Sequence, residues 1–466
     1  MIPLTLAEIA AAVGGVAHNA DPGVRITGAV EYDSRRVQPG GLFVAFAGST
    51  VDGHDFAKHA VAAGAVAVLG TRPVNGIAMV LVDDPLAAMG RLARAVLDRL
   101  PGLTVIGLTG SSGKTTTKDF VAQLAARVGP TVAPAGTFNN ELGLPYTALK
   151  ADDETRFLLL EMGSRGIGHI RYLCDIAPPR IGVVLNVGVA HVGEFGSVEE
   201  IARAKGELVE ALPADGLAVL NADDPRVLAM ADRTKARVLL VGESPQAHVR
   251  AENVTLDERG RPSYTLRMPD LTAAVRLALS GAHQVGNTLA AAAVAREIGL
   301  PDPELAGALG DLRAVSARRM DVFDRADGVT VIDDSYNANP ASVAAALHAL
   351  AALAHGGSRD RRAIAVLGYL AELGGYERAG HEEVGQLAAQ LGIDRLIIVG
   401  DAAEPIRAGA AAVATWGGES VLATDQQAAI AVLREDLRPG DVVLVKGSRY
   451  RTWDVADWLR TPEAAS

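Results

Sequence analysis

The chain has 466 residues, of which 49% are hydrophobic and 21% are charged, and it carries a formal net charge of −11. This balance excludes a disordered chain and predicts packed globular domains, about three of them for this length. The acidic charge argues against a general nucleic-acid binder. Because Cys174 is the only cysteine, an internal disulfide and a thiolate metal cluster are excluded.

Nothing in the sequence predicts membrane insertion. No apolar run approaches the roughly 20 residues that span a bilayer. The N-terminal stretch MIPLTLAEIAAAVGG lacks a basic segment before its apolar part, and it is typical of an amphipathic helix rather than a signal peptide. We therefore expect a cytoplasmic protein, and we expect it to act as a monomer.

Residues 1–85 are predicted to form a small α/β domain. A helix is expected at 56–63, and a second helix at 85–99 ends at the breaker Leu100-Pro101-Gly102. Short apolar runs predict the strands of this domain at 41–46, 66–69 and 78–82.

Residues 86–313 are predicted to form a central domain with a parallel sheet. Continuous apolar strands separated by helical stretches are typical of a sheet that is covered on both faces. Residues 248–280 change to alternating apolar and polar positions, which indicates antiparallel strands, and a helix at 283–297 closes the domain. The parallel strands are expected at 104–109, 157–161, 181–185, 217–220 and 238–241.

Residues 314–466 are predicted to form a third, Rossmann-like domain, joined to the second by a linker near 311–320. Its apolar strands again alternate with helices, which is the pattern of a doubly wound sheet. The fold class is therefore α/β with three domains. The strands of this last domain are expected at 329–333, 363–367, 395–399 and 441–446.

The most informative motif is TGSSGKTT at 109–116, between an expected strand and an expected helix. In this setting, backbone N–H groups and a helix N-terminus converge on phosphate, the lysine adds charge, and the next hydroxyl can bind Mg²⁺. Those last two groups are Lys114 and Thr115. The usual spacing places glycine where this chain has Leu108, so an ordinary glycine-rich turn is the competing interpretation.

Polar side chains that follow the central strands are the next candidates, because ligands bind at the carboxyl ends of parallel strands. Glu161 ends one strand, His191 follows another, and Lys205 lies on the next helix. A carboxylate, an imidazole and a phosphate-loop hydroxyl could hold Mg²⁺ beside a triphosphate. In isolation, His191 could equally be a hydrogen-bonded loop residue and Lys205 a surface lysine.

Taken in order, the motifs resemble those of the Mur ligases, the ATP-dependent amino-acid and peptide ligases of peptidoglycan assembly. The resemblance extends from about Asp33 to Arg449, nearly the whole chain. The motifs that carry it are TGSSGKTTTKD (109–119), FNNELGLP (138–145), EMGSRGIGHI (161–170), NVGVAHVGEFGS (186–197), AKGE (204–207), GAHQVGN (281–287), RRM (318–320), DDSYNANP (333–340) and VKGSR (445–449).

Within that family, the sequence is most similar to the member that adds D-alanyl-D-alanine to UDP-N-acetylmuramoyl-tripeptide. YDSRRVQPGGLFVAFAG with DGHDF resembles a uridine-nucleotide module, so the resemblance makes 1–85 the UDP-muramoyl-binding domain. DDSYNANP has the form typical of the dipeptide-adding enzyme. The Asp-Asn-Pro-Arg signature that reads diaminopimelate is missing from the C-terminal domain, and the similar Asp223-Asp224-Pro225-Arg226 lies in the central one.

The resemblance also implies roles for individual residues. ATP would bind at Gly110, Ser111, Ser112, Gly113, Lys114, Thr115, Thr116, Asn287, Arg319 and Asp334. Two Mg²⁺ ions would be held by Thr115, Glu161, His191 and Lys205, the last as a carbamate, and Lys114, Glu161, His191 and Lys205 would be catalytic. The UDP-muramoyl-tripeptide would contact Ser34, Arg35, Asn139, Asn140, Ser164 and Arg165.

Two positions depart from the family pattern. Tyr369 stands where related ligases usually have Asp or Glu, and the sequence after Arg449 differs from the commoner small-residue pattern, so the residues that contact the dipeptide are left open. His381 could face the cleft, or it could cap a helix or belong to the core. The alternative functions are a tripeptide-forming Mur ligase, a folate polyglutamyl ligase and, in another class, a P-loop kinase or switch protein.

Overall fold

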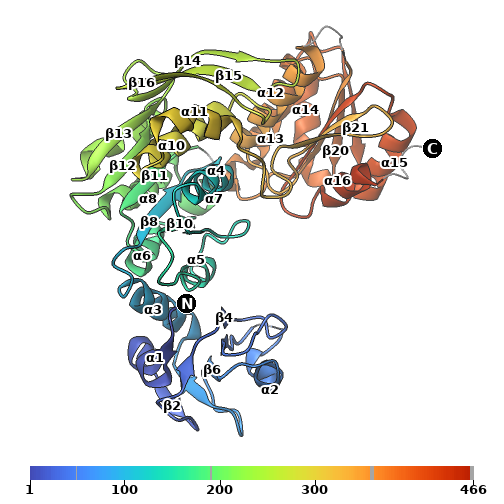
Figure 1. The fold of residues 1–466 in the computed structure, drawn as a ribbon. Coiled ribbons are helices and arrows are strands. Elements are labelled where there is room, and N and C mark those ends of the chain that lie inside the picture. The colour runs from blue at the N-terminus through green and yellow to red at the C-terminus, as the bar shows by residue number, and fades with distance from the viewer. Residues whose placement is uncertain (49, 189–191, 357–360, 462–466) are drawn as a thin grey trace.

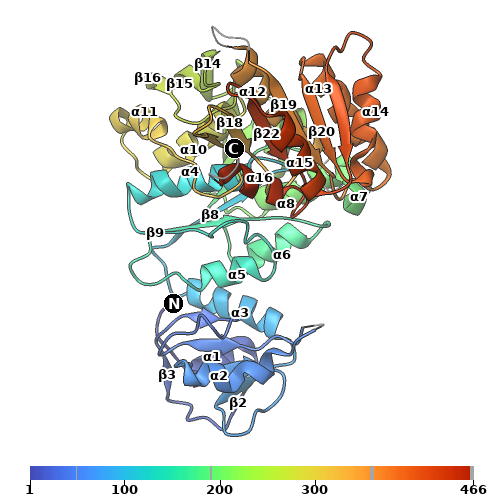
Figure 2. The same ribbon diagram turned by 90° about the vertical axis from the view of Figure 1, so that its right-hand side faces the viewer.

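The computed structural model describes residues 1–48, 50–188, 192–356 and 361–461. Three lobes follow one another along the chain (Figures 1 and 2). The N-terminal lobe lies at one end, next to the central lobe, and the C-terminal lobe packs against the other side of the central one. Within the described part of the chain, no helix is long and apolar enough to cross a membrane.

The N-terminal lobe is a five-stranded sheet with the order β2-β7-β6-β5-β4, in which only the β2–β7 pair is antiparallel. Helix α1 begins with a capping box between Thr5 and Glu8 and ends at the left-handed Gly14 (φ 66°). The elements are β1 (Leu4–Thr5), α1 (Leu6–Val13), β2 (Val16–His18), β3 (Arg25–Ile26), β4 (Val30–Glu31), β5 (Leu42–Val44), η1 (Gly53–Phe56), α2 (Ala57–Ala62), β6 (Ala67–Gly70), β7 (Met79–Leu81) and α3 (Pro85–Leu97).

The central lobe is built on a nine-stranded sheet with the order β16-β15-β14-β13-β12-β11-β8-β10-β9. The pairs from β9 to β14 are parallel, and β14, β15 and β16 form an antiparallel extension. The strands are β8 (Thr104–Thr109), β9 (Thr131–Val132), β10 (Phe157–Glu161), β11 (Ile181–Val184), β12 (Leu217–Asn221), β13 (Arg237–Gly242), β14 (Val249–Leu256), β15 (Pro262–Met268) and β16 (Leu271–Arg276).

Helices cover both faces of this sheet, because its central strands are apolar on both sides. Residues of α4, α10 and α11 share a core with one face, and residues of α5, α6 and α8 share a core with the other. The helices are α4 (Lys114–Ala126), α5 (Gly143–Ala148), α6 (His169–Ile176), α7 (Val192–Phe195), α8 (Val198–Glu210), α9 (Pro225–Leu228), η2 (Ala229–Arg233), α10 (Gln284–Glu297) and α11 (Asp302–Gly310).

The C-terminal lobe is a six-stranded sheet with the order β17-β18-β22-β19-β20-β21, parallel except for the β17–β18 pair. Helices α12 to α14 cover one face, and α15 and α16 the other. The elements are β17 (Asp321–Asp324), β18 (Thr330–Asp333), α12 (Pro340–His355), β19 (Ala363–Gly368), η3 (Gly374–Tyr376), α13 (Glu377–Gln390), β20 (Arg395–Val399), η4 (Asp401–Ala403), α14 (Pro405–Ala411), β21 (Glu419–Ala423), α15 (Gln426–Asp436), β22 (Val442–Lys446) and α16 (Trp453–Arg460).

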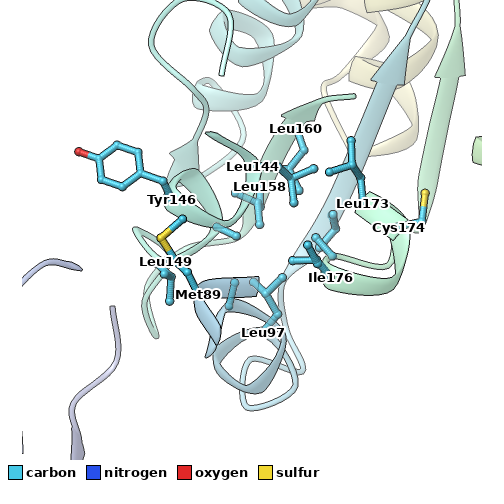
Figure 3. Close-up of a cluster of buried hydrophobic side chains, with 14 of the residues drawn as sticks. Met89, Leu97, Leu144, Tyr146, Leu149, Leu158, Leu160, Leu173, Cys174 and Ile176 are labelled. Carbon is cyan, nitrogen blue, oxygen red and sulfur yellow. The ribbon is translucent and has the colours of Figure 1, made fainter. Parts of the chain in front are cut away.

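One hydrophobic core is shared by the N-terminal and central lobes. It joins the buried faces of α1 and α3 to those of α5 and α6, and Figure 3 shows Met89 beside Leu149 and Leu97 near Ile176. Helix α3 therefore contacts α1, which precedes the predicted boundary at residue 85, as well as α5 and α6, which follow it. The domain ranges 1–85, 86–313 and 314–466 stay a prediction.

The predicted fold class, α/β with parallel sheets in three lobes, is confirmed. Strands β8, β10 and β20 have the predicted bounds, and the antiparallel strands lie within 248–280. The short or edge strands β1, β2, β3, β4, β9, β17 and β21 were not expected from the sequence. These strands contain too few apolar residues to produce a long apolar run, as in β21, where only Val421, Leu422 and Ala423 are apolar.

The shared core predicts a large loss of stability when Leu173 in α6 is replaced by Ala. Leu173 is fully buried, so the change should lower the free energy of unfolding by about 2–5 kcal/mol through lost burial and a cavity. The control is Ile167→Ala, because half of the Ile167 side chain is already exposed and little burial is lost. Urea unfolding followed by circular dichroism measures both variants, and equal midpoints would contradict the prediction.

Candidate functional site

The phosphate loop connects β8 to α4 and is held open by contacts from neighbouring elements. Asn186, which follows β11, accepts hydrogen bonds through Oδ1 from the backbone N–H groups of Ser111 (3.0 Å) and Ser112 (2.9 Å). Gly113 has φ +79°, and a Cβ atom there would lie 2.6 Å from Asn287 Oδ1, so this position requires glycine. The loop is thus fixed before any ligand arrives.

Lys114 lies at the first position of α4 and bends back over the loop. Its Nζ donates to the carbonyl oxygen of Gly110 at 2.7 Å. Burial lowers the pKa of this ammonium, with Glu161 acting in the opposite direction. Lys114 is half-buried. A partly desolvated cation at the start of a helix, where the helix dipole is also positive, favours an anionic ligand.

Glu161 is the central carboxylate of the site. It is fully buried at the end of β10, next to β8, and it accepts hydrogen bonds from Thr115 Oγ1 (2.9 Å) and Asn139 Nδ2 (2.8 Å). In the described residues no group of three His, Cys, Asp or Glu side chains could hold a metal by itself. The Thr115–Glu161 pair does fit Mg²⁺, which proteins often bind through one or two side chains, with phosphate and water as the other ligands.

Lys205 is buried on α8, with 4% of its surface exposed. Desolvation, together with the nearby Lys114 ammonium, holds the pKa of Lys205 well below its usual range. This shift favours the uncharged form of the amine. The remaining predicted metal ligand, His191, lies outside the described residues.

A cavity of about 200 Å³ lies on one side of the loop, between the central and C-terminal lobes. The predicted residues Asn287, Arg319 and Asp334 line it together with Ser112, Gly113 and Thr116. Asn287 is held by Thr117 Oγ1 (3.2 Å) and by the Oε1 of Gln284 (3.0 Å). The size and polar lining suit the nucleoside part of a ligand whose phosphates reach the loop.

Several residues of this smaller cavity were not assigned to it from the sequence. Lys446 is fully buried at the end of β22 and forms an ion pair with Asp334. Burial lowers the pKa of His283 to about 4, so this imidazole is neutral. Asn186 follows β11, and its bonds to the loop depend on the β11–β8 pairing, which the sequence does not show.

A second cavity, of about 450 Å³, lies on the other side of the loop. Side chains of the C-terminal lobe close it, including Tyr369, Ser448, Arg449 and Arg451. The predicted residues that line it are Ser111, Ser112, Gly113, Lys114, Thr115, Thr116, Asn139, Asn140, Glu161, Ser164, Arg165, Lys205 and Arg319. The buried Ser164 Oγ has no hydrogen-bond partner within the described part of the chain, so it is available to a ligand.

Ser34 and Arg35 lie in the N-terminal lobe and line neither cavity. Arg35 is largely exposed and forms a two-point ion pair with Asp33. Ser34 is buried. The structure thus brings together the predicted ATP and metal residues that it describes, but not these two predicted uridine-nucleotide contacts.

Tyr369 lines the larger cavity, where it supplies a phenol rather than a carboxylate. Its hydroxyl donates to Glu377 Oε2 at 2.9 Å, and its ring stacks on His381 with centroids 5.3 Å apart. His381 is fully buried: Nε2 accepts from Leu370 N, and Nδ1 lies 2.7 Å from the Glu377 carbonyl oxygen, to which it donates. His381 is therefore a core residue that fixes the loop after β19.

The motif at 223–226 is structural. Asp224 caps α9 by accepting from Arg226 N and Val227 N, and its second oxygen accepts from Val187 N at 2.7 Å. Asp223 accepts from the backbone N–H groups of Glu243 and Ser244. With their oxygens bound to backbone, these carboxylates hold the loops of the central sheet.

Comparisons with known proteins agree with this geometry. Three family descriptions match successive parts of the chain: "Mur ligase family, catalytic domain" at 27–96, "Mur ligase middle domain" at 108–295, and "Mur ligase, glutamate ligase domain" at 318–449. The UDP-N-acetylmuramoyl-tripeptide--D-alanyl-D-alanine ligase of Mycobacterium tuberculosis is 50% identical over 96% of both chains.

Solved structures give the same result. A crystal structure of MurF from Acinetobacter baumannii has a TM-score of 0.88 and 29% identity, covering 99% of this chain and 100% of that one. MurF from Thermotoga maritima in complex with ADP has a TM-score of 0.78 and 30% identity, covering 94% and 96%. The chain therefore belongs to the Mur ligase family of ATP-dependent, amide-bond-forming enzymes.

Proposed function

We propose that this chain uses ATP to join D-alanyl-D-alanine to UDP-N-acetylmuramoyl-tripeptide, which yields the UDP-linked pentapeptide precursor of peptidoglycan. The observation that carries the proposal is the larger cavity, where the phosphate loop, Glu161 and Lys205 lie opposite side chains of the C-terminal lobe. The name of the 50% identical mycobacterial relative supports this substrate pair over other amine acceptors. We place the reaction in the cytoplasm and expect a monomer.

ATP would lie along the phosphate loop, with its nucleoside in the smaller cavity. The backbone N–H groups at 110–116 and the Lys114 ammonium would neutralise the phosphate oxygens. Asn287, Arg319 and Asp334 would position the nucleoside and phosphates, since all three line that cavity. Bound Mg²⁺ would supply further neutralisation of the reacting oxyanions, and Thr115 and Glu161 would hold it.

Lys205 is proposed to carry a carbamate. Its lowered pKa favours the neutral amine, whose nitrogen would attack CO₂ to form an N–C bond, release a proton and become an anion. A carbamate offers carboxylate oxygens where an ammonium group would repel a cation. It would also balance the charge of Lys114, which otherwise disfavours a second cation nearby. With His191 it would serve a second magnesium ion.

The reaction needs an activated carboxylate, because an amine cannot displace oxide. The γ-phosphoryl group of ATP passes to the tripeptide carboxylate, which gives an acyl phosphate and ADP. The dipeptide amine then attacks the carbonyl carbon, loses a proton and releases phosphate. Two lobes that close over one cavity exclude water, which would otherwise hydrolyse the acyl phosphate.

The muramoyl-tripeptide would extend from the larger cavity toward the N-terminal lobe. Asn139, Asn140, Ser164 and Arg165 would contact its peptide part, since they line the cavity wall away from the nucleoside. Ser34 and Arg35 would bind the uridine nucleotide. This arrangement assigns substrate binding to residues 1–85, ATP binding to 86–313 and closure over the dipeptide to 314–466.

Product analysis tests the function directly. With UDP-N-acetylmuramoyl-tripeptide, ATP, Mg²⁺ and D-alanyl-D-alanine, mass spectrometry should find the amide product with loss of one water, and one phosphate should be released per product. Amide formation with diaminopimelate as the acceptor of a UDP-linked dipeptide would instead indicate a tripeptide-forming ligase. A phosphorylated hydroxyl product, or slow ATP hydrolysis without any acceptor dependence, would contradict ligation.

Replacing Lys205 by Ala should lower kcat by about 10²–10³-fold, the usual effect of removing one electrostatic stabiliser. If the carbamate is real, short carboxylic acids added to the variant should restore part of the rate, because they can fill the space with a carboxylate. Lys235→Ala is the control, since Lys235 is exposed. An unchanged rate in Lys205→Ala would remove this residue from the mechanism.

Replacing Glu161 by Gln keeps the shape of the side chain but removes its charge. We expect the Mg²⁺ concentration for half-maximal activity to rise at least about tenfold, because a neutral amide is a weak magnesium ligand. Glu243→Gln changes an exposed side chain and should leave the Mg²⁺ requirement as it is. Identical magnesium titrations for Glu161→Gln and wild type would show that Glu161 does not hold the ion.

A further inference from the structure

The linker between the central and C-terminal lobes contains two strained residues. Arg318 has φ 59° and Met320 has φ 50°, in the left-handed region that non-glycine residues rarely adopt. The residue between them is Arg319. Such conformations persist only where surrounding contacts determine them, and they gather at functional sites.

The strained backbone directs Arg319 toward both cavities. The Arg319 guanidinium lies over the ring of Tyr336, with its Cζ atom 4.2 Å from the ring centroid. Its Nη2 lies 3.5 Å from Thr115 Oγ1 at the phosphate loop, and its buried Nε has no hydrogen-bond partner in the described part of the chain. Arg319 thus has donors available to an anion beside the loop.

Arg318 points the other way and is held by α16. Its guanidinium lies over the ring of Trp453, with 4.6 Å from Cζ to the centroid, and its Nη2 donates to Asp457 Oδ1 at 2.7 Å. The Asp457 side chain is 58% exposed, so this ion pair contributes little. The stacking on Trp453 is therefore the stronger restraint on Arg318.

Trp453 is itself fixed by its surroundings. Its indole Nε1 donates to the carbonyl oxygen of Ser335 at 2.7 Å, and the Tyr450 ring lies 4.5 Å from its own. The Tyr336 ring lies against the Arg319 guanidinium. The backbone N–H of Tyr336 donates to the Arg318 carbonyl oxygen at 3.2 Å. A continuous set of contacts therefore runs from Trp453 through the linker to Arg319.

We propose that Trp453 is a positioning residue for the nucleotide: by stacking on Arg318 it holds the strained linker and sets Arg319 against the phosphates of bound ATP. The proposal rests on the proposed function, in which the triphosphate lies along the loop. It gives a role to Trp453, which lies in the stretch after Arg449. Trp453 lines neither cavity, so it would act only through Arg318 and Arg319.

The test measures ADP binding to the full chain in the presence of Mg²⁺ by isothermal titration calorimetry. Trp453→Leu should raise the dissociation constant of ADP about fivefold to tenfold, the effect of losing one partly buried cation–π contact. Trp453→Phe keeps an aromatic ring over Arg318 and should restore most of the affinity. Trp458→Leu is the matched control, because Trp458 lies on the same helix and stacks on Arg325 and Arg434, away from the linker.

A double-mutant cycle distinguishes positioning from a general loss of structure. In an Arg319→Ala background, Trp453→Leu should cause no further loss of ADP affinity. An equal loss in both backgrounds, or an equal effect of Trp458→Leu, would overturn the proposal. If Trp453→Leu does not fold, Arg318→Met removes the same stacking contact and takes its place in the cycle.

The outcomes also separate this inference from the function on which it rests. If the wild-type chain binds ADP and Trp453→Leu binds it equally well, the positioning role is wrong and the ligase assignment stands. If the wild-type chain binds no ADP, the nucleotide site itself is wrong.

Discussion

The site depends on how buried charges are balanced in one small volume. Lys205 is buried and Lys114 is half-buried, the Lys114 ammonium disfavours a charge on Lys205, and Glu161 is the fully buried carboxylate beside the loop. A buried charge without a partner is costly, so this arrangement is stable only if one lysine gives up its proton or an anion binds. The lowered pKa of Lys205 favours the loss of its proton. A bound polyphosphate would supply the anion.

The geometry that concentrates these groups comes from two parallel sheets whose carboxyl ends face each other. In the central sheet, β10 pairs with β8 so that Glu161 lies opposite Leu108, just before the phosphate loop. In the C-terminal sheet, Asp333 lies opposite Val445, which places Asp334 beside Lys446. In both sheets the parallel strands end at the same edge, so the polar residues at their carboxyl ends lie close together. The cavities lie where these two edges meet.

Much of this could be predicted from the sequence, because the informative signals are local. The apolar run that ends at Glu161 fixes a buried strand and its polar end, and the glycine-rich turn before Lys114 fixes a phosphate loop. Long-range relations could not be predicted in this way. Asn186 holds the loop only because β11 pairs with β8, and nothing local marks Arg318 as left-handed or places it on Trp453. Edge strands such as β21 also escaped prediction, since the apolar run of β21 is only the three residues Val421, Leu422 and Ala423.

The contact between α7 and η3 shows how closely the two lobes meet. The backbone N–H of Gly193 donates to the carbonyl oxygen of Glu372 at 3.3 Å, and a Cβ atom on Gly193 would lie 2.5 Å from the backbone nitrogen of Gly374. A Cβ atom on Gly374 would in turn lie 2.5 Å from the Cα of Gly193, so both positions need glycine for the lobes to touch. Since Tyr369 begins the same loop as Glu372, the approach that brings these backbones together also closes the larger cavity. The backbones of Gly193 and Gly374 therefore limit how closely the two lobes can approach each other. A side chain at either position would hold the lobes further apart.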